Sequence, residues 1–231
     1  MAVARKVAMT GSQNIVSYPA ASRIPVGAAV VVSSATAGAE TIQAATNGDE
    51  YILGIAGNRD EGLPKGKYDM FYEQYEMVPI VQDYAYALVT PNRGNYNIDL
   101  GDFLEVAVLA STSSRHGVLE EAGTQAGGTG TALSVARAMQ SVTMGSTSYA
   151  ALGATLSVGD TTATVASGAP TTMGLSIGDY ILLEDIDSER QVNRVTSLTA
   201  TTIGLEIPST VGAAQTTDYV SKLFWCKVKI L

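Results

Sequence analysis

The residues of this chain that could act as catalysts are few and scattered. The single histidine, His116, follows Ser113, Ser114 and Arg115 in a polar stretch. A serine and a histidine can serve as nucleophile and general base, but the reaction also needs an oriented third group and an oxyanion hole. We therefore interpret His116 as a solvated loop residue and predict no catalytic residue.

Carboxylates gather in one predicted turn between two β-prone segments, at Glu184, Asp185, Asp187 and Glu189. Hard cations such as calcium favour several oxygen ligands on a flexible loop. The spacing is not that of an EF-hand loop, and Arg190 follows directly. We interpret the group as a solvated acidic hairpin tip and predict no metal site.

Two further features could suggest a cofactor or redox chemistry. The glycine-rich stretch Gly127-Gly128-Thr129-Gly130 lacks the Gly-Lys-Ser/Thr ending of a phosphate-binding loop, so it is predicted to be a surface loop. The single cysteine, Cys226, lies in an apolar segment beside Trp225, which predicts a buried, unreactive thiol. The sequence predicts no cofactor.

The charge balance argues against two classes of partner. The chain of 231 residues has a formal net charge of −8, whereas nucleic-acid binding depends on clustered lysine and arginine. It also lacks an apolar run of the roughly 18 residues that a membrane helix needs. We predict binding neither to nucleic acid nor to a membrane.

The elements of the chain are predicted to be strands, because residues with high β propensity dominate and helical periodicity is scarce. A short phrase recurs in which an apolar residue and Gly-Asp precede a β-prone run. It occurs at Leu100-Gly101-Asp102, at Ile177-Gly178-Asp179 and, in a weaker form, at Val158-Gly159-Asp160. Glycine permits a positive φ and aspartate can bind nearby backbone groups, so each phrase predicts a turn that leads into a strand.

The predicted strands divide the chain into three parts. Residues 1–23 are an extended arm with little patterning, residues 24–145 together with 220–231 form a small antiparallel β-barrel or sandwich, and residues 146–219 form an inserted second β domain. Asn47-Gly48 predicts a hairpin between strands at Thr41–Ala45 and Tyr51–Asn58. Ser134–Val142 is predicted to be a strand, with a short helix as the alternative.

A group of aromatic and methionine side chains is the candidate interface. Such residues bury large areas at protein interfaces, and a tyrosine hydroxyl can still find a partner there. Packing inside the barrel and a platform for glycans remain as alternatives. The candidate interface residues are Tyr68, Met70, Phe71, Tyr72, Tyr75, Tyr84 and Tyr86.

An ordered series of short motifs resembles a known family. Val26–Val31, Tyr51–Ala56, Leu100–Leu104, Ser134–Val142 and Cys226–Leu231 follow one another as in the small β-barrel capsid decoration, or cement, proteins of tailed bacterial and archaeal viruses. Leu156–Val165, Gly174–Ile181 and Arg194–Leu198 look like β modules of phage and prophage virion proteins. The compact members of the family lack this inserted block.

The resemblance implies a structural, non-enzymatic protein of the virion. It implies that the chain binds the outer capsid surface, bridges neighbouring capsomers of the major capsid protein, and forms a homotrimer. We expect the arm and a barrel edge to pair with adjacent subunits. The alternatives are a carbohydrate- or receptor-binding module of a virion tail or spike and, third, a hydrolase that uses Glu184, Asp185 or Asp187.

Overall fold

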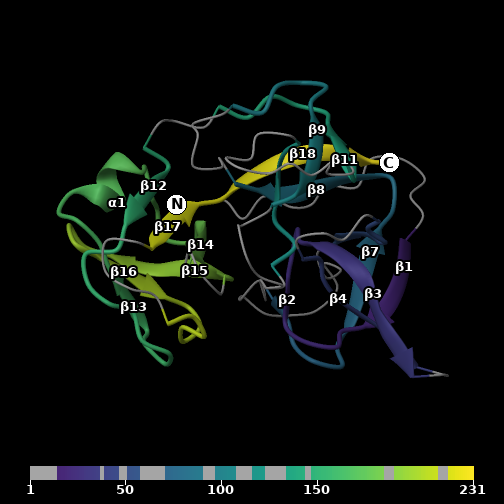
Figure 1. Ribbon diagram of the computed structural model, residues 1–231, viewed down its shortest axis with the longest axis horizontal. Helices are drawn as coiled ribbons and strands as arrows, with labels where there is room; N and C mark the ends of the chain where they lie inside the picture. The colour runs from purple at the N-terminus through teal and green to yellow at the C-terminus, as the bar shows by residue number, and fades with distance from the viewer. Residues whose placement is uncertain are drawn as a thin grey trace, which may run out of the picture.

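In the part of the chain that the structure describes, eighteen strands and one helical turn form two units that lie side by side (Figure 1). This computed structural model describes residues 15–36, 39–46, 51–57, 71–90, 97–107, 116–122, 134–143, 147–184, 190–212 and 218–231. Within these ranges the protein is mainly β and contains a barrel, as the sequence predicts. The described helix, α1 (Ala169–Thr172), has four residues, and no described helix is long and apolar enough to span a membrane.

The first unit begins with a five-stranded antiparallel sheet in the order β1-β7-β5-β3-β4. One of its faces, which includes Ile80, packs on Ile24 and Tyr72. The other face joins the core of the adjoining barrel through residues such as Ile55 and Val81. The sheet strands are β1 (Ile15–Pro19), β3 (Ala29–Thr36), β4 (Ala39–Ala44), β5 (Gly54–Ala56) and β7 (Met77–Val81), and the pair β2 (Ile24–Pro25) and β6 (Phe71–Tyr72) lies beside them.

Five further strands close into a barrel in the order β10-β8-β18-β11-β9. The expectation that a barrel edge pairs with a neighbouring subunit is therefore wrong, because each barrel strand already has two neighbours within the chain. The C-terminal segment supplies the long strand that pairs with β8 along its whole length. The barrel strands are β8 (Tyr84–Val89), β9 (Phe103–Val106), β10 (Leu119–Glu121), β11 (Ala136–Ala138) and β18 (Phe224–Ile230).

The second unit is a curled six-stranded sheet in the order β12-β17-β14-β15-β16-β13. A bridge between Leu152 and Val165 links its two edge strands and curls the sheet around its own apolar core. It spans the segment predicted to be an inserted domain and also includes residues 220–222. Its strands are β12 (Tyr149–Ala151), β13 (Thr162–Thr164), β14 (Tyr180–Glu184), β15 (Arg190–Leu198), β16 (Thr202–Leu205) and β17 (Tyr219–Lys222).

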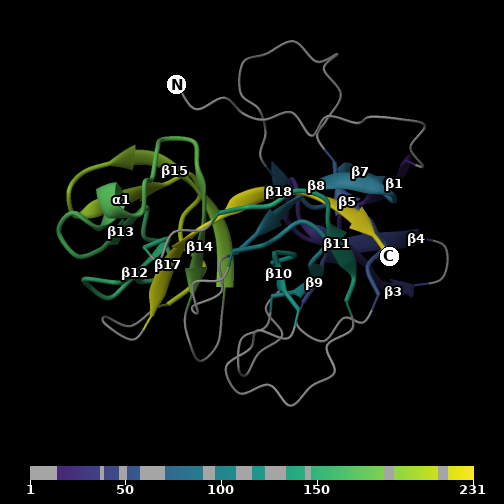
Figure 2. The same ribbon diagram turned by 90° about the horizontal axis from the view of Figure 1, so that it is seen from above.

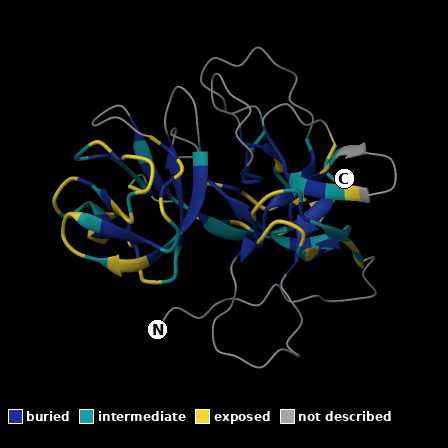
Figure 3. Ribbon diagram, turned by 90° about the horizontal axis from the view of Figure 1, so that it is seen from below, coloured by how far each residue is buried: buried dark blue, intermediate teal, exposed yellow. Residues whose placement is uncertain are grey.

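An apolar junction joins the two units. Phe71, Leu88 and Val118 of the first unit form one cluster with Tyr180 and Leu182 of the second. Seen from above, the chain runs directly from β17 in one unit into β18 in the other (Figure 2). Buried residues run through both units and the region between them (Figure 3). The second unit thus has a defined orientation on the first.

The Gly-Asp phrases form turns that lead into strands, as predicted. In each turn the glycine has a positive φ, and the aspartate side chain accepts a hydrogen bond from the backbone N–H three residues before it. Each turn also holds one residue of another segment, which means that the two exchange a pair of backbone hydrogen bonds. In the first turn, Gly101 N–H donates to Ala138 O at 2.9 Å, and Ala138 N–H donates to Asp102 O at 2.8 Å. The other two phrases hold Ser209 and Val195 in the same way.

Two more turns have this construction without the phrase. Pro25–Ala28 holds Ala56, and its Gly27 has φ +84°. Glu73–Glu76 holds Ala20, with the Glu76 carboxylate accepting the N–H of Glu73 at 2.6 Å. In this turn Tyr75 occupies the glycine position, with φ +68°.

Two local predictions differ from the structure. The Asn47-Gly48 hairpin is wrong, because β3 lies between β4 and β5 in the sheet; residues 47 and 48 themselves lie outside the described residues. At the end of the predicted arm, Ile15–Pro19 form β1 and pair with β7 of the same chain. The segment Ser134–Val142 contains strand β11, as predicted.

Candidate functional site

A cleft of about 320 Å³ lies where the two units meet. Interfaces between structural units are a common place for binding sites, so this cleft is the candidate site. Its lining mixes apolar side chains with polar and charged ones. The first unit contributes Arg23, Pro25, Phe71, Glu73 and His116, and the second contributes Arg190, Gln191, Val192, Ile207 and Thr210.

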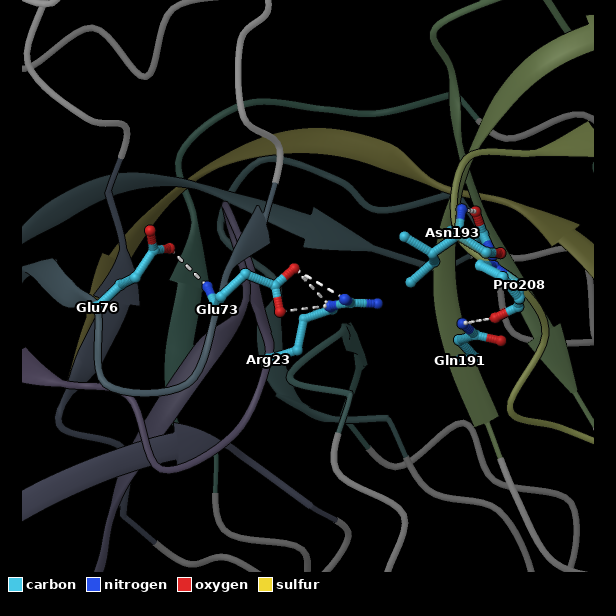
Figure 4. Close-up of polar contacts among 7 residues, drawn as sticks. Arg23, Glu73, Glu76, Gln191, Asn193 and Pro208 are labelled. Atoms are coloured by element: carbon cyan, nitrogen blue, oxygen red, sulfur yellow. Dashed lines mark hydrogen bonds and ion pairs between the residues drawn. The ribbon is translucent and has the colours of Figure 1, made fainter. Parts of the chain in front are cut away.

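One wall of the cleft carries the ion pair of Arg23 and Glu73. The Arg23 Nε atom lies 2.9 and 3.1 Å from the two carboxylate oxygens, and Nη2 lies 2.8 Å from Oε1. The Glu73 backbone N–H donates to the Glu76 carboxylate, which fixes the turn that carries Glu73 (Figure 4). Both side chains are substantially exposed, so the pair orients this wall more than it stabilises the fold.

The opposite wall is held together by two amide side chains of β15. Gln191 Nε2 donates to Pro208 O at 3.2 Å, and Asn193 Nδ2 donates to Ile207 O at 2.8 Å (Figure 4). The Asn193 oxygen also accepts the backbone N–H groups of Glu206 and Ile207. These bonds fix residues 206–210 against β15 without a regular strand ladder.

His116 lines the cleft and is buried, so the prediction of a solvated histidine is wrong. Burial, together with the nearby positive charge of Arg190, lowers its pKa to about 3. The neutral ring accepts the N–H of Val118 on Nδ1 at 3.0 Å, so its own proton sits on Nε2. Nδ1 is thus already engaged, and Ser113 and Ser114 lie outside the described residues.

Glu184 ends strand β14 beside Arg190, the first residue of β15. The Nε atom of Arg190 lies 3.7 Å from Glu184 Oε1, and both side chains are nearly inaccessible to solvent. The strands do form the predicted hairpin, but its Glu184 is a buried ion-pair partner and not a solvated tip residue. Asp185, Asp187 and Glu189 lie outside the described residues.

A second serine motif, around Ser176, resembles a nucleophile elbow in sequence but not in backbone geometry. Gly174-Leu175-Ser176-Ile177-Gly178 matches the Gly-x-Ser-x-Gly phrase, which in α/β-hydrolases places the serine between a strand and a helix. Here Ser176 is exposed and opens the turn that holds Val195, and strand β14 follows. The backbone around Ser176 therefore lacks the strand-to-helix geometry of a nucleophile elbow.

The residues predicted as an interface fall into different environments. Tyr72 is fully buried, and its hydroxyl donates to Gly57 O at 2.7 Å; Phe71 is also buried. Tyr84 and Tyr86 are half-buried on β8, and Tyr84 lies under the Lys229 ammonium. Tyr75 is 74% exposed. Tyr68 and Met70 lie outside the described residues.

Sequence reasoning missed the polar residues that shape the cleft. Arg23 and Glu73 are 50 positions apart, and no pattern links them. Asn193 could have been noticed as a polar residue in the β-prone segment that follows the predicted acidic turn. The buried, unreactive state predicted for Cys226 agrees with its zero exposure and with a pKa that burial raises to about 12.

Within the described ranges, no three histidine, cysteine or acidic side chains come close enough to hold a metal ion. Comparison with known proteins adds no assignment: no family model matches the chain, and no curated protein or solved structure is significantly similar to it.

Proposed function

We propose that this chain is a non-enzymatic structural protein of a virion that binds the outer capsid surface and bridges neighbouring capsomers of the major capsid protein. The observation that carries the proposal is the apolar junction between the units. A bridging protein must hold two contact surfaces at a fixed separation, and a shared apolar core provides that rigidity. Homotrimeric assembly on the shell belongs to the same proposal.

The state of the cleft supports a structural role over a catalytic one. Arg23 is paired with Glu73, Glu184 with Arg190, and the Nδ1 atom of His116 with a backbone N–H. Groups that are already paired in this way stabilise a shape, whereas a general base needs an available lone pair near its substrate. The cleft remains the natural place for a glycan if the chain is instead a receptor-binding module.

The contacts with the shell are proposed to come from exposed side chains and not from strand pairing by the barrel. The barrel is closed, and the edge strands of the second unit are bridged to each other. Many weak contacts repeated over a lattice give strong attachment, because each bound site raises the effective concentration of the next.

The test is to purify virus particles from the source organism by density gradient and to label them with an antibody against this chain. We expect the label on the outer surface of filled heads, and the chain in the particle proteome in a fixed ratio to the major capsid protein. Its absence from purified particles overturns the proposal. Labelling confined to tails, together with binding on a glycan array, favours the receptor-binding alternative.

A further inference from the structure

Tyr75 has a backbone conformation that its residue type disfavours. It is the one non-glycine residue with a positive φ in the part of the chain that the structure describes. The other four turns of the same construction have glycine at this position: Gly27, Gly101, Gly159 and Gly178. A bulky side chain in this region is a genuine outlier and indicates strain.

The strain at Tyr75 is not offset by burial of its side chain, because the residue is 74% exposed. The backbone is nevertheless firmly held: Tyr75 N–H donates to Ala20 O at 2.7 Å, and Ala20 N–H donates to Glu76 O at 2.9 Å. The protein thus presents a fixed, exposed tyrosine where glycine would be more stable. Such an arrangement is typical of a residue whose side chain makes its contacts with a partner.

Among the described residues, the strand ladder that adjoins Tyr75 carries exposed side chains without charge. Along the antiparallel pair of β1 and β7, alternate residues face the same side as each other: Ile15, Ser17 and Pro19 on one strand, Met77 and Pro79 on the other. Val81, the partner of Ile15, also lies on this face but is buried in the barrel core. Ile15 is 44% exposed and Met77 is 56% exposed. We call these five residues, with Tyr75 at the end of the ladder, the β1–β7 surface.

The charges near this surface suit contact with an identical chain. Each copy carries a net charge of −8, so copies repel unless they meet where carboxylates are few or neutralised. The β1–β7 surface has no ionisable side chain other than the Tyr75 phenol. The neighbouring Glu73 carboxylate is neutralised by Arg23, and that of Glu76 accepts the N–H of Glu73.

We propose that the β1–β7 surface is the contact between copies of this chain and that Tyr75 is its anchor. This inference rests on the homo-oligomeric assembly in the proposed function and names the surface that makes it. The occupant is a second copy of the chain. In a trimer around a three-fold axis the β1–β7 surface meets a different face of that copy, because contact between two identical surfaces closes at a dimer.

The test combines two measurements on the full-length Tyr75→Gly variant. Removal of the strain should raise the midpoint of thermal unfolding, measured at concentrations where sedimentation velocity finds the monomer. Removal of the anchor should weaken self-association by about tenfold or more in sedimentation velocity over a dilution series. A rise in thermal stability combined with a loss of association is the signature of a strained contact residue.

Two further variants complete the design. Tyr51→Ala removes another exposed tyrosine, 80% accessible and not part of the surface, and should leave association unchanged. Met77→Lys places a charge on the surface and should weaken association without relieving the turn. Both keep the strained Tyr75 backbone, so neither should show the rise in stability.

The inference is overturned if the wild-type chain is monomeric at every concentration, or if Tyr75→Gly gains stability and associates as before. These outcomes leave the proposed function standing, because a monomer can still be found on labelled particles. Conversely, Tyr75-dependent oligomers of a chain that is absent from particles would retain this surface and refute the capsid role.

Discussion

A Cβ atom on Gly27 would lie 2.7 Å from the Cη2 atom of Trp225, so the indole ring occupies the space that a side chain at position 27 would need. The same indole ring also contacts the second unit, where it forms a T-shaped pair with Tyr180 with the ring centroids 5.5 Å apart. One tryptophan therefore links the first turn of the sheet to the junction between the units.

Replacement of Gly27 by alanine should be strongly destabilising. It adds a methyl group against Trp225 and Leu88 and forces alanine to adopt φ +84°. Overpacking costs about 1–3 kcal/mol and the left-handed backbone about 1 kcal/mol more, so we expect a loss of about 3 kcal/mol in the free energy of unfolding, measured by urea denaturation.

Gly159→Ala is the matched control for this prediction. Gly159 has φ +96° in a turn of the same construction, but no atom lies within 4 Å of a Cβ placed there. The Gly159→Ala variant should lose only the cost of the left-handed backbone, about 1 kcal/mol of the free energy of unfolding. Equal losses in the two variants would show that the contact with Trp225 is unimportant.

The turns show how far the sequence could predict this fold. The turn needs a residue with positive φ at its third position and an acceptor for the backbone N–H of its first residue. The three Gly-Asp turns were recognisable because glycine and aspartate are the commonest residues for these two roles. Pro25–Ala28 escaped notice because proline has no N–H and so needs no acidic acceptor at Ala28. The Glu73–Glu76 turn was not recognised because Tyr75 takes the place of glycine at the positive φ and Glu76 takes the place of aspartate as the acceptor.

Asn193→Ala should also be strongly destabilising. The Asn193 side chain is completely buried, and its loss leaves the Ile207 N–H without its acceptor and the Ile207 carbonyl without the amide N–H that it accepts, whereas the Glu206 N–H keeps the Arg194 carbonyl. Buried groups that lose a partner cost about 1–3 kcal/mol each, so we expect a loss of about 3 kcal/mol in urea denaturation.

Thr199→Ala is the control for Asn193. Its hydroxyl oxygen also accepts two backbone N–H groups, those of Thr201 and Thr202, but at an exposed turn where water can replace it. The loss should stay below about 1 kcal/mol. If Asn193→Ala were as mild as this control, the amide would not be what holds residues 206–210.

The cleft was beyond sequence reasoning for a different reason. His116 and Arg190 are 74 positions apart, and their proximity depends on how the second unit packs on the first. The pattern around His116 is polar, so it indicated solvent. The actual burial comes from long-range packing at the junction, which local composition does not encode.

Tyr180→Phe should stabilise the protein. The Tyr180 hydroxyl is buried at the junction and, among the described residues, has no hydrogen-bond partner; burial also raises its pKa. Removing an unsatisfied buried hydroxyl should add about 1 kcal/mol to the free energy of unfolding. Tyr72→Phe serves as the contrast, because the buried Tyr72 hydroxyl donates to Gly57 O and its removal should cost about 1 kcal/mol. If both variants lost stability, the Tyr180 hydroxyl would have a hydrogen-bond partner after all.

His116 should make stability depend on pH in mildly acidic solution. Its pKa falls from 6.5 to about 3 on folding, chiefly through burial and secondly through Arg190. Between these values the unfolded chain binds more protons than the folded one, so stability is complete above pH 6.5 and decreases as the pH falls towards 3. The slope attributable to one histidine approaches 1.4 kcal/mol per pH unit.

The measurement is urea denaturation between pH 5 and about 6.5, a window chosen because carboxylates titrate mainly below it. His116→Asn, whose amide oxygen can still accept the N–H of Val118, should flatten the curve there, and an unchanged slope in that variant would mean that another group titrates.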